Sequence, residues 1–124
     1  MLSLPPSVKI FLAPGATDMR KAIDGLSALV SGVLQEDPLS GHLFVFCHRR
    51  RDRMKILVWD SGGFWLLVKR LEAGTFDWPT AAEDGAVVLT SWELTMLLEG
   101  VDLKHVRRRK RYRAGGAEPT AVAA

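Results

Sequence analysis

The chain has 124 residues, 48% of them hydrophobic and 25% charged, so it can bury one ordinary hydrophobic core without disulfides or a structural metal. Its single cysteine has no intramolecular partner, which argues against a disulfide-built secreted fold and is typical of a reducing cytosol. No apolar run approaches the roughly 18 residues of a membrane span, so we expect a soluble, cytoplasmic protein without membrane contact.

The formal net charge of +3 is divided unevenly along the chain. Residues 1–103 carry ten Lys and Arg against thirteen Asp and Glu, whereas residues 104–124 carry seven against one. This division predicts a single, slightly acidic domain over residues 1–103, followed by a basic segment and disordered tail over residues 104–124. Because the excess positive charge is confined to the tail, the sequence indicates a polyanionic partner, of which nucleic acid is the commonest in a cytosol.

The first predicted elements are a strand and a helix. The apolar residues 9–13 predict a short strand that Pro14 and Gly15 terminate. Thr17 is suited to cap a helix, and Asp18 in its first turn would complement the helix dipole. Apolar residues then recur at spacings of three and four, which predicts an amphipathic helix over about residues 18–35. Its predicted buried stripe is Met19, Ile23, Leu26, Val30, Val33 and Leu34.

Three apolar runs follow in quick succession, at residues 43–48, 54–59 and 64–71. The links between them are too short for a parallel crossover, so the runs predict an antiparallel meander. Both side-chain parities of these strands are largely apolar, so we expect the sheet to be covered on both faces. The first helix would provide one cover. A second helix or another subunit would provide the other, which leaves room for a homodimer.

The last predicted elements are a short strand at residues 86–89 and a second helix. Thr90-Ser-Trp-Glu93 matches a capping box, so the helix is expected to run to about Glu99 and to stop at Gly100. Its buried stripe would be Leu94, Leu97 and Leu98. The sequence therefore predicts an α+β fold, with an antiparallel meander sheet of four to five strands, one long and one short flanking helix, and a basic C-terminal tail.

The strongest local signal is a run of six basic residues in seven positions, interrupted by one aromatic residue. The run comprises Arg107, Arg108, Arg109, Lys110, Arg111, Tyr112 and Arg113. Such a run neutralises backbone phosphates and releases counterions, and the tyrosine can stack on a base. A solubilising tail is the alternative interpretation. Phosphate contacts carry no base code, so sequence specificity does not follow from the run.

A second basic cluster falls on the predicted turn between the first two strands of the meander. It comprises Arg49, Arg50, Arg51 and Arg53, with Lys55 beyond them. A protruding basic hairpin could enter a nucleic-acid groove. Alternatively, the cluster is a solvated turn whose like charges block edge-to-edge aggregation.

The start of the first helix offers a weaker basic signal. Arg20 and Lys21 lie where free backbone N–H groups could help to hold a phosphate. An ion pair between Arg20 and Asp24, four residues apart on a helix, is the favoured interpretation.

Four tryptophans are many for this length. Trp59, Trp65 and Trp92 lie within predicted elements and are expected in the core. Trp78, next to Pro79 in a predicted loop, is the candidate for a base-stacking platform or an interface anchor at the surface.

Catalytic sites find little support in the sequence. Cys47 and His48 are neighbours on a strand and point to opposite faces, so they cannot easily share a metal with His42. Asp60 and Glu72 end strands, where polar residues are expected anyway. We therefore expect a protein that is not an enzyme and has no cofactor or metal.

Several short motifs follow one another in a fixed order between the N-terminus and about residue 103. They include Thr17-Asp-Met-Arg-Lys21, Asp24-Gly-Leu26, Leu43-Phe-Val-Phe46, Trp59-Asp60, Lys69-Arg-Leu-Glu72, Trp78-Pro79 and Leu97-Leu-Glu-Gly100. In order and spacing they resemble the accessory proteins, often called TnpB, of the insertion-sequence-sixty-six family of bacterial transposable elements.

The resemblance implies a protein that is encoded beside a larger transposase and assists transposition. It offers no catalytic residues to transfer. We therefore expect a non-catalytic accessory protein that binds the DNA of the element ends, the transposase, or both. In this interpretation residues 107–113 supply the main phosphate contacts and the hairpin arginines supply secondary ones. A pure adaptor of the transposase without direct DNA contact, or a small metal-dependent nuclease using Asp60 or Glu72, are the alternatives.

Overall fold

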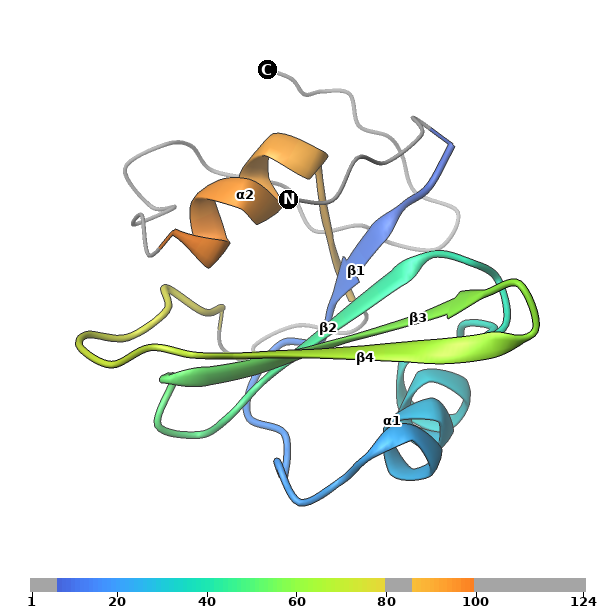
Figure 1. Ribbon diagram of the computed structural model, residues 1–124, viewed down its shortest axis with the longest axis horizontal. Coiled ribbons are helices and arrows are strands. Elements are labelled where there is room, and N and C mark those ends of the chain that lie inside the picture. Colours follow the sequence, from blue (N-terminus) through green and yellow to red (C-terminus); the bar gives the residue numbers. More distant parts are fainter. Residues whose placement is uncertain (1–6, 80–85, 100–124) are drawn as a thin grey trace.

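A computed structural model describes residues 7–79 and 86–99. In it, one five-stranded sheet with the strand order β4-β3-β2-β1-β5 is flanked by α1 on one face and α2 on the other (Figure 1). The elements are β1 (Ile10–Leu12), α1 (Ile23–Leu29), the π-helical turn η1 (Val30–Leu34), β2 (Leu43–Cys47), β3 (Arg53–Asp60), β4 (Gly63–Arg70), β5 (Val87–Leu89) and α2 (Ser91–Leu98). The predicted α+β class, with one long and one short helix, is confirmed.

The meander predicted from the three apolar runs is confirmed as β2, β3 and β4, which pair antiparallel in this order. Ser61 and Gly62 form the two-residue link between β3 and β4, with φ angles of 47° and 89°. A two-residue hairpin turn of this kind favours positive φ at both positions, because its twist then matches that of the strands.

The sheet is mixed, so the prediction of a purely antiparallel sheet is wrong at one strand. β1 pairs parallel with β2, from Ile10 opposite Leu43 to Leu12 opposite Val45. The chain between these two strands carries α1 and η1, and a helical crossover of this length returns the chain in its original direction. On its other side β1 pairs antiparallel with β5.

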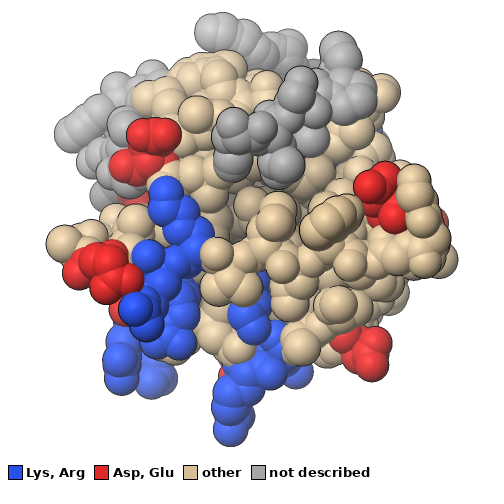
Figure 2. Space-filling model, in the orientation of Figure 1, with Lys and Arg blue, Asp and Glu red and all other residues tan. Residues whose placement is uncertain are grey.

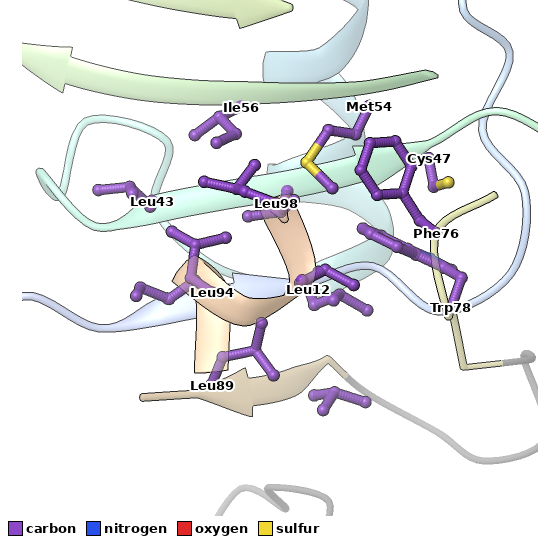
Figure 3. Close-up of a cluster of buried hydrophobic side chains, with 14 residues drawn as sticks. Leu12, Leu43, Cys47, Met54, Ile56, Phe76, Trp78, Leu89, Leu94 and Leu98 are labelled. Carbon is purple, nitrogen blue, oxygen red and sulfur yellow. The ribbon is translucent and has the colours of Figure 1, made fainter. Parts of the chain in front are cut away.

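The alternation of side chains along β2 divides the core into two layers. Leu43, Val45 and Cys47 belong to the cluster on the α2 face, part of which Figure 3 shows. Phe44 and Phe46 belong to the cluster on the α1 face. The helical members are Leu94, Leu97 and Leu98 on the α2 face and Leu26, Val30 and Leu34 on the α1 face. Each fully buried aliphatic side chain contributes about 1.5–3 kcal/mol, so covering both faces stabilises the fold substantially.

The first helix begins later than predicted, and Thr17 does not cap it. The helix begins at Ile23 after the N-cap residue Ala22, which makes no side-chain capping bond. Thr17 is buried, and its N–H donates to the carbonyl of Cys47 at 2.8 Å. The chain before the helix therefore stays pinned to the end of β2. Asp18 is engaged in a local turn, in which it accepts a hydrogen bond from the N–H of Arg20 at 2.9 Å.

The end of this helix departs from the predicted stripe at one residue. Leu26, Val30 and Leu34, four residues apart, are buried, whereas Val33 is 68% exposed. The π-helical turn η1 has more residues per turn than an α-helix, so a row at spacing four stays on the sheet while Val33 rotates outward. Gln35 then ends the helix in the left-handed conformation, with φ of 57°.

The second helix agrees with the prediction. The Thr90 side chain accepts a hydrogen bond from the N–H of Glu93, and the Glu93 carboxylate accepts one from the N–H of Thr90. This is the predicted capping box. Gly100, the predicted stop, lies outside the described residues. Over the part of the chain that the structure describes, no helix combines the length and apolarity needed to cross a bilayer.

Candidate nucleic-acid interface

The turn between β2 and β3 carries the arginine cluster found in the sequence. The N–H of Arg51 donates to the carbonyl of His48 at 2.8 Å, and the N–H of Arg50 donates to Nδ1 of the same histidine at 3.0 Å. Arg51 takes a left-handed conformation, with φ of 65°. Arg49 and Arg50 are exposed at the tip, whereas Arg51 and Arg53 are half-buried.

The segment after β4 braces this turn. The turn therefore does not form the freely protruding hairpin that the sequence suggests. The N–H of Phe76 donates to the carbonyl of Arg51, and the N–H of Leu71 donates to the carbonyl of Asp52, both at 2.7 Å. Phe76 is buried in the core beside the turn. The arginines are therefore mounted on a fixed part of the domain, where their spacing is set by the fold.

The register of the meander adds a basic residue that is far away in sequence. Arg70, at the end of β4, lies directly opposite Arg53, at the start of β3. Arg70 forms an ion pair with Glu72 at 3.0 Å. Arg53 Nε is buried and has no hydrogen-bond partner within the described residues. Arg70 has Glu72 as its counter-ion, whereas Arg53 has none among the described residues, so this end of the sheet favours an anion beside Arg53.

Lys55 links this end of the sheet to the segment before α1. Side chains two residues apart on a strand share a face, so Lys55 lies on the α1 face together with Arg53. Its Nζ donates to the carbonyls of Met19 and Lys21, at 2.8 and 2.9 Å. These bonds hold Lys21, which is exposed, next to β3.

We call this set of cations the basic surface. It consists of Lys21, Arg49, Arg50, Arg53, Lys55 and Arg70. Figure 2 shows Lys and Arg side chains gathered over the ends of β3 and β4 and the segment before α1, with Asp and Glu side chains toward the margins of the same view. Arg49, Arg50, Arg53 and Lys55 are already close in sequence, and the fold adds Lys21 and Arg70 to them.

Two other basic residues have local roles. Arg20 pairs with Asp18 at 2.8 Å, so the expected pair with Asp24 is wrong. The hydrogen bonds from Arg20 hold the pKa of the Asp18 carboxyl well below its usual range. Lys69 lies on the α2 face, where its Nζ donates to the carbonyl of Leu98 at 2.7 Å, at the end of α2. A cation there satisfies a free carbonyl and complements the helix dipole.

The basic run of the tail is not included in the basic surface. Residues 107–113 lie outside the described residues, so their role in phosphate contact stays a prediction. The structure brings the hairpin arginines together with Lys21, Lys55 and Arg70.

The tryptophans are arranged in a way opposite to the prediction. Trp78, expected at the surface, is 3% exposed, and its Nε1 donates to the carbonyl of Ala13 at 2.9 Å. Trp65 and Trp92, expected in the core, are 59% and 49% exposed. Trp59 is half-buried and packs edge-on against Phe64. The exposed aromatic surface therefore lies on β4 and α2.

The residues considered for catalysis do not converge. Asp60 and Glu72 lie beyond opposite ends of β4, at least a strand length apart. His42 and Cys47 are likewise at opposite ends of β2. Cys47 is fully buried, and burial raises the pKa of its thiol to about 12. Within residues 7–79 and 86–99, no three His, Cys, Asp or Glu side chains are grouped so that they could hold a metal ion.

Comparison with known proteins identifies relatives over most of the chain. The family model described as IS66 Orf2 like protein matches residues 8–108. The uncharacterized protein y4hO of Sinorhizobium fredii is 40% identical over 105 residues, which cover 85% of this chain and 90% of the relative. A second protein of that organism, y4jC, is 36% identical over 109 residues, which cover 88% and 92%. No solved structure matches the chain.

Proposed function

The chain belongs to the IS66 Orf2-like family, and from this premise we propose that it assists transposition by binding DNA of the element through its basic surface. The family supports the general role of a transposition-associated accessory protein. The resemblance read from the sequence motifs is thereby confirmed.

One observation carries the proposal of DNA contact. Arg49 and Arg50 at the tip of a braced turn lie at the same end of the sheet as Arg53 and Arg70, two cations that directly face each other. Arg70 is paired with Glu72, whereas Arg53 has no counter-ion among the described residues, and a phosphate group supplies one when it binds. An arrangement of this kind suits the phosphate backbone, which bears a regular series of negative charges.

The basic surface is suited to hold the duplex and not to read its sequence. Its cations reach phosphates from the α1 face and from the turn, and phosphate contacts fix register and orientation without a base code. In the proposed division of labour, residues 104–124 add affinity, and any selectivity for element ends comes from the transposase or from DNA shape.

Fluorescence anisotropy tests this proposal with a labelled element-end duplex and a scrambled duplex, each at low and high salt. The full chain is expected to bind both, with an affinity that falls steeply as salt rises. Arg50→Gln should reduce the log–log salt slope by about 0.9, because one phosphate contact is lost.

Lys9→Gln is the matched control, because it also removes one exposed positive charge, but at the opposite end of the sheet, where Lys9 precedes β1. It should leave the slope nearly unchanged. A chain lacking residues 104–124 should bind more weakly and retain its sensitivity to Arg50→Gln. Failure of the full chain to bind either duplex at low salt, combined with capture of the transposase, would establish the adaptor role and refute direct DNA contact.

A further inference from the structure

β4 is an open edge strand that carries an unusual amount of uncovered apolar surface. Residues 64–68 are five consecutive large apolar residues, Phe-Trp-Leu-Leu-Val, and none of them is buried. Trp65 is 59% exposed and Val68 is 58% exposed, on opposite faces of the strand. By contrast, all five residues of β2, in the middle of the meander, are buried. The apolar sequence of β4 is therefore that of a strand with neighbours on both sides.

The edge also lacks the usual features that prevent strand pairing. Natural edge strands are short, bulged, or interrupted by proline or inward-facing charge. β4 pairs with β3 over eight consecutive residues without a bulge, and residues 64–68 contain neither proline nor charge. Within residues 7–79 and 86–99 no further strand pairs with this edge, so its backbone groups are available to another strand.

We propose that the occupant is β4 of a second copy of this chain, paired antiparallel about a two-fold axis at Leu66. Leu66 is the centre of the apolar run. In this register Phe64 lies opposite Val68 of the second copy, and Trp65 lies opposite Leu67 of the second copy. Every large apolar residue of the run then meets an apolar partner.

The charges at the ends of the strand favour the same orientation. Asp60 lies at the turn that precedes β4, and Lys69 and Arg70 lie at its other end. Antiparallel pairing places the basic end of each copy, where Glu72 already pairs with Arg70, beside the turn of the other copy that carries Asp60. Parallel pairing would place the basic ends together, and like charges on neighbouring strands are destabilising.

A groove on the α2 face provides room for the exposed indole. It is lined mainly by Met54, Ile56, Leu67 and Leu98, and its volume is about 390 Å³. Trp65 of the second copy lies opposite Leu67 on this face. Its Nε1 donates to Asp60 of its own chain at 3.3 Å, so the ring reaches the groove by turning away from this bond. The same apolar surface is buried twice, once in each copy, as a two-fold interface requires.

The association closes at two copies. The opposite edge of the sheet is β5, which has three residues and two of them buried, so it offers no comparable surface. With one such edge among the described strands of each chain, the two-fold contact forms a dimer and does not propagate into a fibre.

The dimer also places the basic surfaces of both copies on the same side of the combined sheet. A two-fold axis normal to the sheet makes the two α1 faces point in the same direction. Arg70 is four residues from the axis, so the two copies of this residue are about 26 Å apart along the strands. This separation is of the same order as one turn of B-DNA, about 34 Å, so one duplex could contact both surfaces.

Sedimentation velocity of the full chain over a wide concentration range tests the inference, with the double variant Trp65→Glu/Val68→Glu. The full chain should sediment as a dimer. The double variant should sediment as a monomer with an unchanged circular dichroism spectrum, because both positions are exposed. Val33→Glu and Trp92→Glu, at other exposed apolar positions, are the matched controls and should remain dimeric.

Cysteine cross-linking tests the register. Leu66→Cys should cross-link two chains under mild oxidation, because residue 66 meets itself at the axis. Leu67→Cys should not, and the native Cys47 is buried and does not compete. A full chain that is monomeric at all concentrations overturns the proposal, as does a dimer that survives the double variant. Cross-linking through Leu67→Cys alone overturns the register, and a monomeric chain whose edge binds the transposase overturns the choice of occupant.

Discussion

Arg53 and Arg70 occupy directly opposite positions on β3 and β4, so two cations face each other at one end of the sheet. The pair predicts that stability and DNA affinity change in opposite directions. Arg53→Thr should stabilise the fold by about 0.2–1 kcal/mol, because it removes a buried guanidinium Nε that has no hydrogen-bond partner among the described residues and introduces a residue that favours strands. The same change should weaken binding to duplex DNA. Urea denaturation and fluorescence anisotropy of one preparation measure the two effects, and a parallel loss of both would contradict the prediction.

Trp78 is expected to anchor the segment that braces the arginine turn. Trp78→Phe keeps an aromatic ring but leaves the buried carbonyl of Ala13 without its donor, which should cost about 1–3 kcal/mol of unfolding free energy. Trp92→Phe, at a residue that is 49% exposed, should change it by less than about 0.5 kcal/mol. Denaturant titration of both variants distinguishes them, and equal losses would show that the indole bond has no special role.

The capping box of α2 should contribute measurably to stability. Thr90→Ala removes the acceptor of the Glu93 N–H and should destabilise the protein by about 1 kcal/mol. Thr95→Ala makes the same chemical change inside the helix, where the hydroxyl donates to the carbonyl of Ser91. That variant should be neutral or slightly stabilising, because alanine has the higher helix propensity. Thermal unfolding of the two variants provides the comparison.

The buried thiol of Cys47 predicts a pH dependence in the alkaline range. Burial raises the pKa of Cys47 from 9.0 to about 12, so the unfolded chain loses this proton at a lower pH than the folded chain does. The contribution is complete below pH 9 and is lost as the pH rises toward 12. Relative to Cys47→Ala, the native chain should lose stability more steeply above pH 9. A thiol reagent should label it only after denaturation, and rapid labelling of the folded protein would contradict this prediction.

Much of the fold could be predicted because it depends on patterns among residues that are close in sequence. The alternation in β2 gave the two-layer core, since Phe44 and Phe46 point one way and Leu43 and Val45 the other. The capping box at Thr90 was readable for the same reason, because its partners are three residues apart. The α1 start was not readable, because the bond between Thr17 and Cys47 outweighs the local preference of threonine for an N-cap.

The candidate site could be predicted only in part. The hairpin arginines are contiguous in sequence, but Arg70 joins them through the strand register, which a charge count does not reveal. The tryptophans show the same limit. Trp65 was assigned to the core because it lies in a strand, yet strand order makes that strand an edge. The sequence contained one usable signal for the position of Arg70, namely the short links of the meander. Because each link reverses the chain, the end of β4 must lie at the same end of the sheet as the arginine turn.

The position of β1 has a consequence for the synthesis of the protein. β1 emerges early from the ribosome, but its second neighbour in the sheet is β5. Ile10 therefore cannot pair on both sides until Leu89 has been synthesised. Contacts between segments so distant in sequence form slowly, and they leave an incomplete chain with an unpaired strand. A product that terminates before residue 86 would leave β1 as an open edge, in addition to the β4 edge through which we propose that two copies pair. Nascent chains of this protein should therefore depend on complete translation, and their truncated forms should be found in aggregates.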